Sequence, residues 1–354
     1  MKVQPIIGPH TGVKSHVSDI MLQVIFALIP ATLFGLYFFG WPAINLFVIT
    51  LVSAVVFEFL CLRLADKPTI TLRDNSALLT GWLLAMTLPP WAPWWIGVVG
   101  AGISIILGKH VFGGLGQNVF NPAMLARVAL LISFPVEMTT WANVTPLFTS
   151  QAPDFIQGLQ ITFMGLGQPD AYTGATVMGH VKTELLQDRL LPESLNGMYQ
   201  QPQAWLGFMP GSLGETSALL LALGGVWLLY KGVIKWQIPF AVLSAVFVFA
   251  SVFHWIDPQH YLSPWIHLSS GALILTAFFI ATDYVTSPNS AVGQLVFGFS
   301  CGGLIFIIRT WGGYPEGAGF AVLLMNAMTP LIDHYIKPRI YGRNRKGLPL
   351  ESEQ

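Results

Sequence analysis

The sequence predicts an all-α polytopic membrane protein of about ten transmembrane helices, in two inverted five-helix repeats, with a polar extracytoplasmic insert after the fifth helix. Three observations predict this class. Of the 354 residues, 53% are hydrophobic and only 10% are charged, against roughly a quarter charged in a soluble domain. Apolar runs recur from Ile20 almost to the end of the chain. Basic residues gather in four groups between these runs.

The apolar runs fall into two sets of five, and we expect each run to be a helix. The first membrane half, residues 20–134, contains the runs 20–39, 44–62, 75–88, 94–108 and 122–134. The second half, residues 215–336, contains the runs 217–230, 238–253, 268–284, 292–308 and 318–332. Several runs are shorter than the roughly 20 residues that cross a hydrocarbon core, so we expect tilted, extended or broken helices.

Three polar segments flank the two halves. Residues 1–19 lack the apolar core and cleavage site of a signal peptide, so the first apolar run is expected to remain as a span. Residues 135–214 form the long insert. Residues 337–354 form a basic tail. These boundaries give five regions in chain order.

The distribution of lysine and arginine predicts an orientation. Basic residues in short loops are retained on the cytoplasmic side. The four groups are Lys2 and Lys14; Arg63, Lys67 and Arg73; Lys231 and Lys235; and Lys337, Arg339, Arg343, Arg345 and Lys346. With ten spans, all four fall on one face. Both termini are then cytoplasmic, and the insert lies on the periplasmic side.

A weak internal repeat agrees with this count. The stretch Ser76-Ala77-Leu78-Leu79 resembles Gly271-Ala272-Leu273-Ile274, and glycine-rich turns follow at residues 108–116 and 309–317. Five spans per half is an odd number, so the second copy must enter the membrane from the other side. The two turns are candidate ligand or ion sites, or they allow close helix packing.

Composition excludes several kinds of site. Lysine plus arginine and aspartate plus glutamate both total 17, which gives no reason to expect a nucleic-acid partner. The two cysteines, Cys61 and Cys301, lie singly in apolar runs, so no metal or iron-sulfur site is predicted. No nucleotide-binding fingerprint follows a predicted strand. Any redox chemistry with a soluble dinucleotide must therefore use partner subunits.

One short motif in the insert predicts a covalent cofactor. The stretch from Asp170 through Thr173, Gly174 and Ala175 to Thr176 has the pattern Asp-x-x-Thr-Gly-Ala-Thr, a signal for attaching a flavin to protein. The Thr176 hydroxyl can take the phosphate of flavin mononucleotide (FMN) from a separate transferase. The two small residues before it leave the backbone accessible to that enzyme. The alternative is an ordinary turn whose hydroxyl bonds to its own backbone.

The motif, the short N-terminus, the span pattern and the length together resemble the D-type family of Rnf (Rsx) electron transport complexes. The chain is also similar to the B-type component of the sodium-pumping NADH:quinone reductase, but only about twenty residues precede Ile20 here, and that paralogue has a longer extension. The resemblance implies FMN on Thr176 and a second, non-covalent flavin (riboflavin or FMN) in the membrane part. Many family members have proline after the final threonine, where this chain has Val177.

The same resemblance implies the partners and the location. The partners would be the other Rnf subunits, of the A, B, C, E and G types, a flavin transferase for maturation, and membrane lipid. The location would be the bacterial inner membrane. The expected function is that of a redox subunit in a multi-subunit translocase, which passes electrons through FMN and couples their transfer to Na⁺ or H⁺ movement. The alternatives are the B-type component of the sodium pump, a non-redox channel or permease, and a structural anchor.

Two ionisable residues lie deepest in the predicted spans. Glu58 and Arg127 interrupt apolar runs, and intramembrane charges by default mark an ion path, a ligand contact or an internal pair. We name both as candidates for an ion path. The alternative is a structural pair or an interfacial position.

Overall fold

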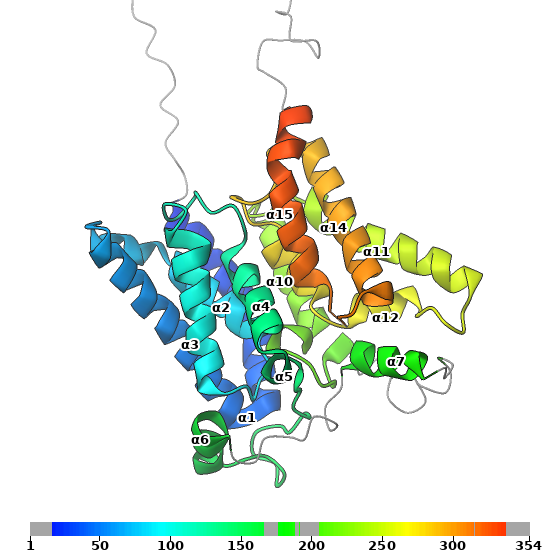
Figure 1. Ribbon diagram of the computed structural model, residues 1–354, viewed down its shortest axis with the longest axis horizontal. Helices are drawn as coiled ribbons and strands as arrows, with labels where there is room; N and C mark the ends of the chain where they lie inside the picture. Colours follow the sequence, from blue (N-terminus) through cyan, green and yellow to red (C-terminus); the bar gives the residue numbers. More distant parts are fainter. Residues whose placement is uncertain (1–15, 166–175, 188–190, 192–204, 315, 338–354) are drawn as a thin grey trace, which may run out of the picture.

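The computed structural model describes residues 16–165, 176–187, 191, 205–314 and 316–337. All regular structure in these residues is helical, which confirms the predicted all-α class (Figure 1). The helices of the first half are α1 (Val17–Leu64), the short 3₁₀ helix η1 (Thr69–Asp74), α2 (Ser76–Thr87), α3 (Trp94–Gly102) continuing as the π-helix η2 (Ile103–His110), and α4 (Pro122–Ser133).

Helix α1 contains the first two predicted spans, joined by a sharp kink. At Gly40 the backbone has φ 72° and ψ −159°, which is unlike helix and which suits glycine. Three carbonyls just before the kink accept hydrogen bonds from outside α1: Tyr37 from the Leu147 N–H (2.8 Å), Phe38 from the Thr145 N–H (3.0 Å) and Phe39 from the Trp91 Nε1–H (2.9 Å). The kink therefore leaves none of these three groups unsatisfied, as an apolar environment requires.

The insert contributes short helices at one end of the molecule. These are α5 (Pro135–Thr139), α6 (Phe155–Met164), α7 (Val177–Leu186) and the 3₁₀ turn η3 (Leu213–Glu215). Helix α6 packs on the kink of α1, where a Cβ on Gly158 would lie 2.6 Å from the Trp41 Cβ. In Figure 1, α6 and α7 lie at the end opposite to the start of α1 and the end of α15.

The second half also contains both long and broken helices. Its elements are α10 (Ala218–Tyr230), α11 (Gln237–Ile256), α12 (Pro264–Ser269), α13 (Leu273–Leu275) continuing as the π-helix η4 (Thr276–Ile280), α14 (Ala291–Trp311) and α15 (Ala318–Tyr335). Helices α11 and α14 approach closely because Gly298 and Gly302 face the backbone of α11. Their spacing is that of a GxxxG motif, which lets membrane helices pack at short range.

One predicted run is not a single helix. The run 268–284 breaks between α12 and α13, where Gly271 adopts φ 71°. A Cβ at this position would meet the side chains of Arg309 and Glu316. The break therefore admits two charged side chains, which a continuous helix would exclude.

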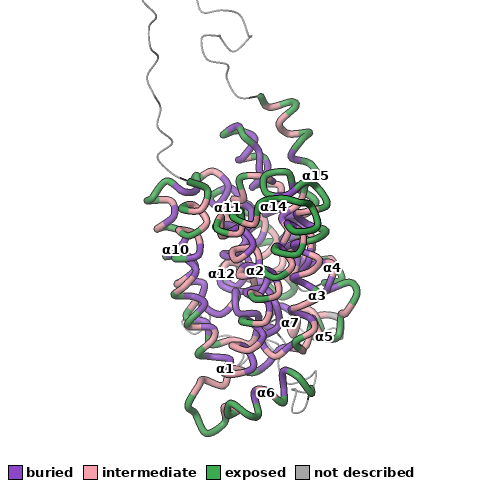
Figure 2. The backbone as a smooth tube through the Cα atoms, turned by 90° about the vertical axis from the view of Figure 1, so that its left-hand side faces the viewer, coloured by how far each residue is buried: buried purple, intermediate pink, exposed green. Residues whose placement is uncertain are grey.

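Three of the described helices, α1, α11 and α14, are long and apolar enough to cross a membrane. Five shorter apolar segments are α2, α3 with η2, α4, α6 and α10. The buried residues gather inside the bundle (Figure 2). Large apolar side chains also cover its outside, among them Leu33, Ile132 and Phe240, each about 60% exposed. An apolar exterior on this scale fits a lipid environment.

Candidate functional site

Thr176, the last residue of the flavin motif, lies at the start of α7. The other named residues of the motif, Asp170, Thr173, Gly174 and Ala175, lie outside the described residues. Thr176 is the N-cap of α7, and its Oγ1 accepts a hydrogen bond from the Gly179 N–H at 3.1 Å. The residue is only 5% exposed. Its hydroxyl therefore lies at a helix N-terminus, where backbone N–H groups and the helix dipole favour a phosphate.

A small cavity adjoins this hydroxyl. Its volume is about 20 Å³, and it is lined by Thr176, Ser270, Glu215 and Glu316 among others. The Ser270 Oγ has no hydrogen-bond partner among the described residues. The cavity is therefore the size of a water molecule and has a free hydroxyl on its wall.

Glu215 and Glu316 separate this cavity from a second one deeper in the bundle. Both carboxylates line both cavities. Glu215 Oε1 accepts from the Ser212 Oγ at 2.7 Å, and Glu316 Oε2 lies 3.3 Å from Arg309 Nη2. The deeper cavity, about 30 Å³, is also lined by Arg127. The deeper cavity therefore lies between the two carboxylates near Thr176 and the guanidinium of Arg127.

Arg127 is buried, as expected from its place in an apolar run. It is 9% exposed, and its Cζ lies 5.9 Å from the centre of the Trp141 ring. Its Nη1 and the Oγ1 of Thr276, which lines the same cavity, have no hydrogen-bond partner among the described residues. Unpaired buried polar groups are costly, so this cavity suits water or another hydrogen-bond acceptor rather than apolar contents.

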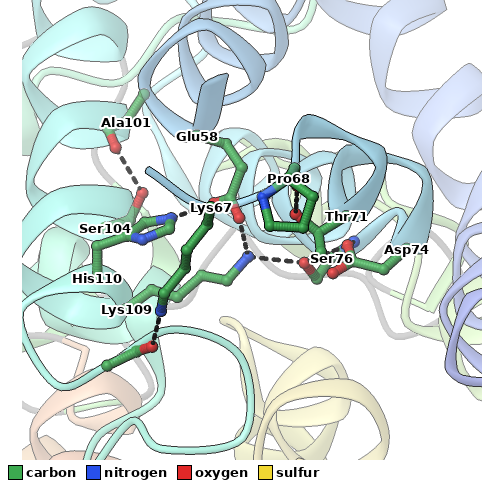
Figure 3. A network of polar contacts seen from close by, with 11 residues as sticks. Glu58, Lys67, Pro68, Thr71, Asp74, Ser76, Ala101, Ser104, Lys109 and His110 are labelled. Carbon is green, nitrogen blue, oxygen red and sulfur yellow. Dashed lines mark hydrogen bonds and ion pairs between the residues drawn. The ribbon is translucent and has the colours of Figure 1, made fainter. Parts of the chain in front are cut away.

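Glu58 lies in a separate cluster near the end of α1, away from the kink (Figure 3). Lys109 Nζ is 2.7 Å from Glu58 Oε1 and 2.7 Å from the Ser76 Oγ. His110 Nε2 lies 3.0 Å from Glu58 Oε2. Glu58 and Lys109 are 3% and 2% exposed. The structure thus pairs Glu58, a predicted candidate, with a lysine from the first glycine-rich turn.

That turn is fixed to the preceding basic loop. Lys67 donates from Nζ to the Gly113 carbonyl at 2.7 Å. Gly113, Gly114 and Gly116 all have positive φ, which explains why glycine recurs here. The turn therefore has a defined conformation next to the Glu58 cluster.

A large cavity lies between the two halves. Its volume is about 100 Å³, and its wall is mainly apolar, with Lys109, Asn121 and Asp283 among its polar groups. The Asn121 Nδ2 lies 3.5 Å from Asp283 Oδ2, and the Asn121 backbone N–H donates to Asn326 Oδ1 at 3.0 Å. Ligand cavities are typically apolar with a few placed polar groups, and the wall of this cavity has that composition.

Sequence reasoning singled out Thr176, Glu58 and Arg127, but it missed Asn121 and the pairing of carboxylates around Thr176. Asn121 is the N-cap of α4 and accepts from the Met124 N–H at 3.2 Å. The Asn-Pro pair after the glycine-rich turn was the available signal, because proline is favoured at the first helical position. The pairing of Glu215 with Glu316 had no local signal.

Comparisons with known proteins give a consistent result. Residues 6–342 match the NQR2, RnfD, RnfE family. The chain is 53% identical over 348 residues to the D component of the ion-translocating oxidoreductase complex of Halorhodospira halophila, covering 98% of both chains. It is 54% identical over 338 residues to the D component of the same complex in Stutzerimonas stutzeri, covering 96% of both. The Rhodobacter capsulatus D component is 50% identical over 305 residues, 86% of this chain and 85% of the relative.

Proposed function

The chain belongs to the NQR2, RnfD, RnfE family, and we propose that it carries FMN as a phosphoester on Thr176 within an ion-translocating oxidoreductase complex. It is a D-type component of such a complex, which couples electron transfer to ion translocation. The observation that carries the flavin assignment is the position of Thr176, the last residue of the motif, at the N-cap of α7.

The residues around Thr176 have distinct roles in this proposal. Thr176 holds the phosphate through Oγ1, and the first-turn N–H groups of α7 stabilise its negative charge. The Ser270 hydroxyl, which has no partner among the described residues, is available to donate a further hydrogen bond. Bound FMN would supply a group that accepts one or two electrons, whose energy the protein tunes by its surroundings.

We assign the expected second, non-covalent flavin to the large cavity between the two halves. Asn121 and Asp283 offer donors and acceptors for a polar ring edge, and Lys109 adds a positive charge. Leu83, Phe278 and Phe279 supply apolar surface. The cavity lies between α2 and η4, so it would receive a cofactor held by both halves.

Two buried charge clusters are candidates for the ion path. The first contains Glu58 and Lys109, and the second contains Glu215, Glu316 and Arg127. Carboxylates inside a membrane are costly and mark cation pathways by default. In the second cluster they lie between Thr176 and the bundle interior, so a charge arriving near Thr176 would act directly on a cation held there.

The proposed inverted repeat is supported by a matched pair of contacts. In the first half, Lys109 at the end of η2 reaches Ser76 at the start of α2. In the second half, Arg309 near the end of α14 reaches the Ser270 carbonyl at 3.0 Å, just before α13. In both halves a basic side chain after the fourth predicted run contacts the third run, at the start of α2 in the first half and at the C-terminal end of α12 in the second.

The proposal also includes sidedness and partners. We place both termini and the basic loops in the cytoplasm, and the insert with Thr176 in the periplasm of a bacterial inner membrane. The partners are the A-, B-, C-, E- and G-type components, with a flavin transferase acting on the periplasmic side. This placement requires electrons to reach or leave a flavin on the periplasmic face.

Flavin fluorescence of the denatured, gel-separated protein tests the assignment. We expect a fluorescent band from protein made with its transferase, and complete loss of that band in Thr176→Ala. The control is Thr183→Ala, which changes a threonine on the same helix and should keep full fluorescence. A wild-type band without fluorescence would instead favour a non-redox channel or permease.

A further inference from the structure

A flavin attached at Thr176 needs a place for its isoalloxazine ring, which is separated from the phosphate by the ribityl chain. The cavity that contains Thr176 has a volume of only about 20 Å³, and two carboxylates line it. Carboxylates disfavour a ring that gains negative charge on reduction. The ring therefore requires a neighbouring site within reach of α7.

Such a site begins two residues further along the same helix. A cavity of about 200 Å³ runs along α7 from Met178 to Leu185, and Met178 lines both this cavity and the one at Thr176. Helical rise is about 1.5 Å per residue, so the middle of this cavity lies on the order of 8 Å along α7 from Thr176. We call this space the α7 cavity.

The α7 cavity has aromatic and apolar walls. Tyr261 and Trp311 meet edge-to-face, with ring centroids 6.2 Å apart, and both line the cavity. Val181, which is 2% exposed, forms the wall on the side of α7. Leu262, which is 9% exposed, forms the wall on the side of the loop before α12. Aromatic faces and branched apolar side chains suit a flat heteroaromatic ring.

Two buried polar groups on the cavity wall have no partner among the described residues. Arg309 is 5% exposed; its Nη1 donates to the His267 carbonyl at 2.9 Å and its Nη2 to the Ser270 carbonyl, while Nε has no partner. The Nδ1 of His267, which is 4% exposed, is also unpartnered. Both residues line the α7 cavity. Unmet hydrogen-bonding groups at this depth indicate a polar ligand edge rather than an apolar occupant.

The charges on this wall also match a flavin. Arg309 brings a guanidinium, whose Nη2 also lies 3.3 Å from Glu316 Oε2, and Lys182 adds a second positive charge at the cavity rim, with Nζ 3.2 Å from the Tyr314 carbonyl oxygen. A positive charge beside the pyrimidine edge of the ring stabilises its reduced form. The α7 cavity therefore differs in sign from the carboxylate-lined cavity at Thr176.

We propose that the α7 cavity seats the isoalloxazine ring of the flavin attached to Thr176, with Tyr261 and Trp311 against the ring and Arg309 and His267 at its polar edge. This inference rests on the proposed phosphoester at Thr176. It assigns the ring and the phosphate to two adjoining cavities on one helix.

The test is the fluorescence of the native, flavinylated protein relative to the amount of covalent flavin measured after denaturation. An indole in contact with the ring quenches its emission, so Trp311→Leu should raise native fluorescence several-fold. Trp265→Leu is the matched control, because Trp265 is 49% exposed against 53% for Trp311, lies on α12 at the same end of the molecule, and does not line the cavity. Equal native fluorescence in both variants would overturn the proposal.

A second measurement needs no substitution. Iodide should quench the flavin of the native wild-type protein several-fold less strongly than the flavin of the denatured protein, because the α7 cavity shields the ring. Equal quenching in the two states would show the ring to be in solvent and would also overturn the proposal. Absence of flavin after denaturation is a separate outcome, which rejects the phosphoester at Thr176 itself.

Discussion

At the scale of single residues, the Oγ1 of Thr176 has two roles. It caps α7 and is the proposed acceptor of the flavin phosphate. Because the residue is 5% exposed, the proposed attachment requires Oγ1 to be accessible before α7 docks or in a state in which α7 has moved away.

The interpretation of the buried Glu58 carboxylate depends on the basic residues beside it. In the sequence it is an isolated carboxylate within an apolar run, whereas in the structure it has Lys109 and His110 as neighbours (Figure 3). Removing one member of a buried pair leaves the other charge uncompensated, which costs about 3–5 kcal/mol. The pair is therefore best examined by changing both members.

We expect Glu58→Gln to lower the free energy of unfolding by about 3 kcal/mol, because it strands the Lys109 charge. The double variant Glu58→Gln/Lys109→Met should regain most of this stability, because it removes both charges. Thermal unfolding in detergent measures both effects. If the stable double variant still moved ions at the wild-type rate, the cluster would be structural and not part of the ion path.

At the scale of elements, the interruptions in the helices say more about the candidate sites than the regular helical segments do. The kink at Gly40, the break at Gly271 and the π-helices η2 and η4 all occur within or between apolar runs. π-Helical turns are rare and frequently lie at functional sites. Here η2 ends at Lys109 and His110, and η4 carries Thr276 into the Arg127 cavity. The irregular elements thus position the charged and polar groups.

Substitution of Gly40 tests the kink. Gly40→Ala should lower stability by about 1–3 kcal/mol, because the φ of 72° is unfavourable for alanine. The expected readout is a lower midpoint of thermal unfolding in detergent. Gly313→Ala is the control, since nothing lies within 4 Å of its Cβ position and its φ is ordinary, so its midpoint should be unchanged. Equal midpoints for the two variants would contradict a strained kink.

At the scale of the whole molecule, the proposed function needs two faces with different chemistry. The Glu58 cluster lies near the basic loop that contains Lys67, whereas Thr176 and the α7 cavity lie at the end that carries the insert helices. The large cavity lies between the halves and shares Lys109 with the Glu58 cluster. A cofactor there and one at Thr176 would lie toward opposite faces of one bundle.

Cysteine labelling in intact cells tests this sidedness. A membrane-impermeant thiol reagent should label Ser150→Cys, which is exposed in the insert, and should not label Thr71→Cys, which is exposed in η1. Both should be labelled once the membrane is permeabilised. Wild-type protein serves as the background control, because Cys301 is buried and Cys61 is partly buried. Labelling of Thr71→Cys alone would reverse the proposed orientation.

The helical class, the ends of most helices and the residue proposed to hold FMN could be predicted from the amino-acid sequence. These follow from local pattern, because a chain in lipid must satisfy its backbone within helices and because the flavin motif is contiguous. The break at Gly271 was not predicted, since its cause lies in Arg309 and Glu316, which are distant in sequence. Which charges are neighbours follows from the packing of the helices.

The same distinction holds for the sites. Thr176 is recognisable from seven consecutive residues, but the α7 cavity requires α7, the loop before α12 and the end of α14 to meet. Glu58 and Lys109 are 51 positions apart, and Asn121 and Asp283 are 162 apart. Cavities and buried ion pairs arise where packed helices bring such positions together. Apolar periodicity predicts which face of a helix is buried. It does not predict which side chains of other helices will contact that face.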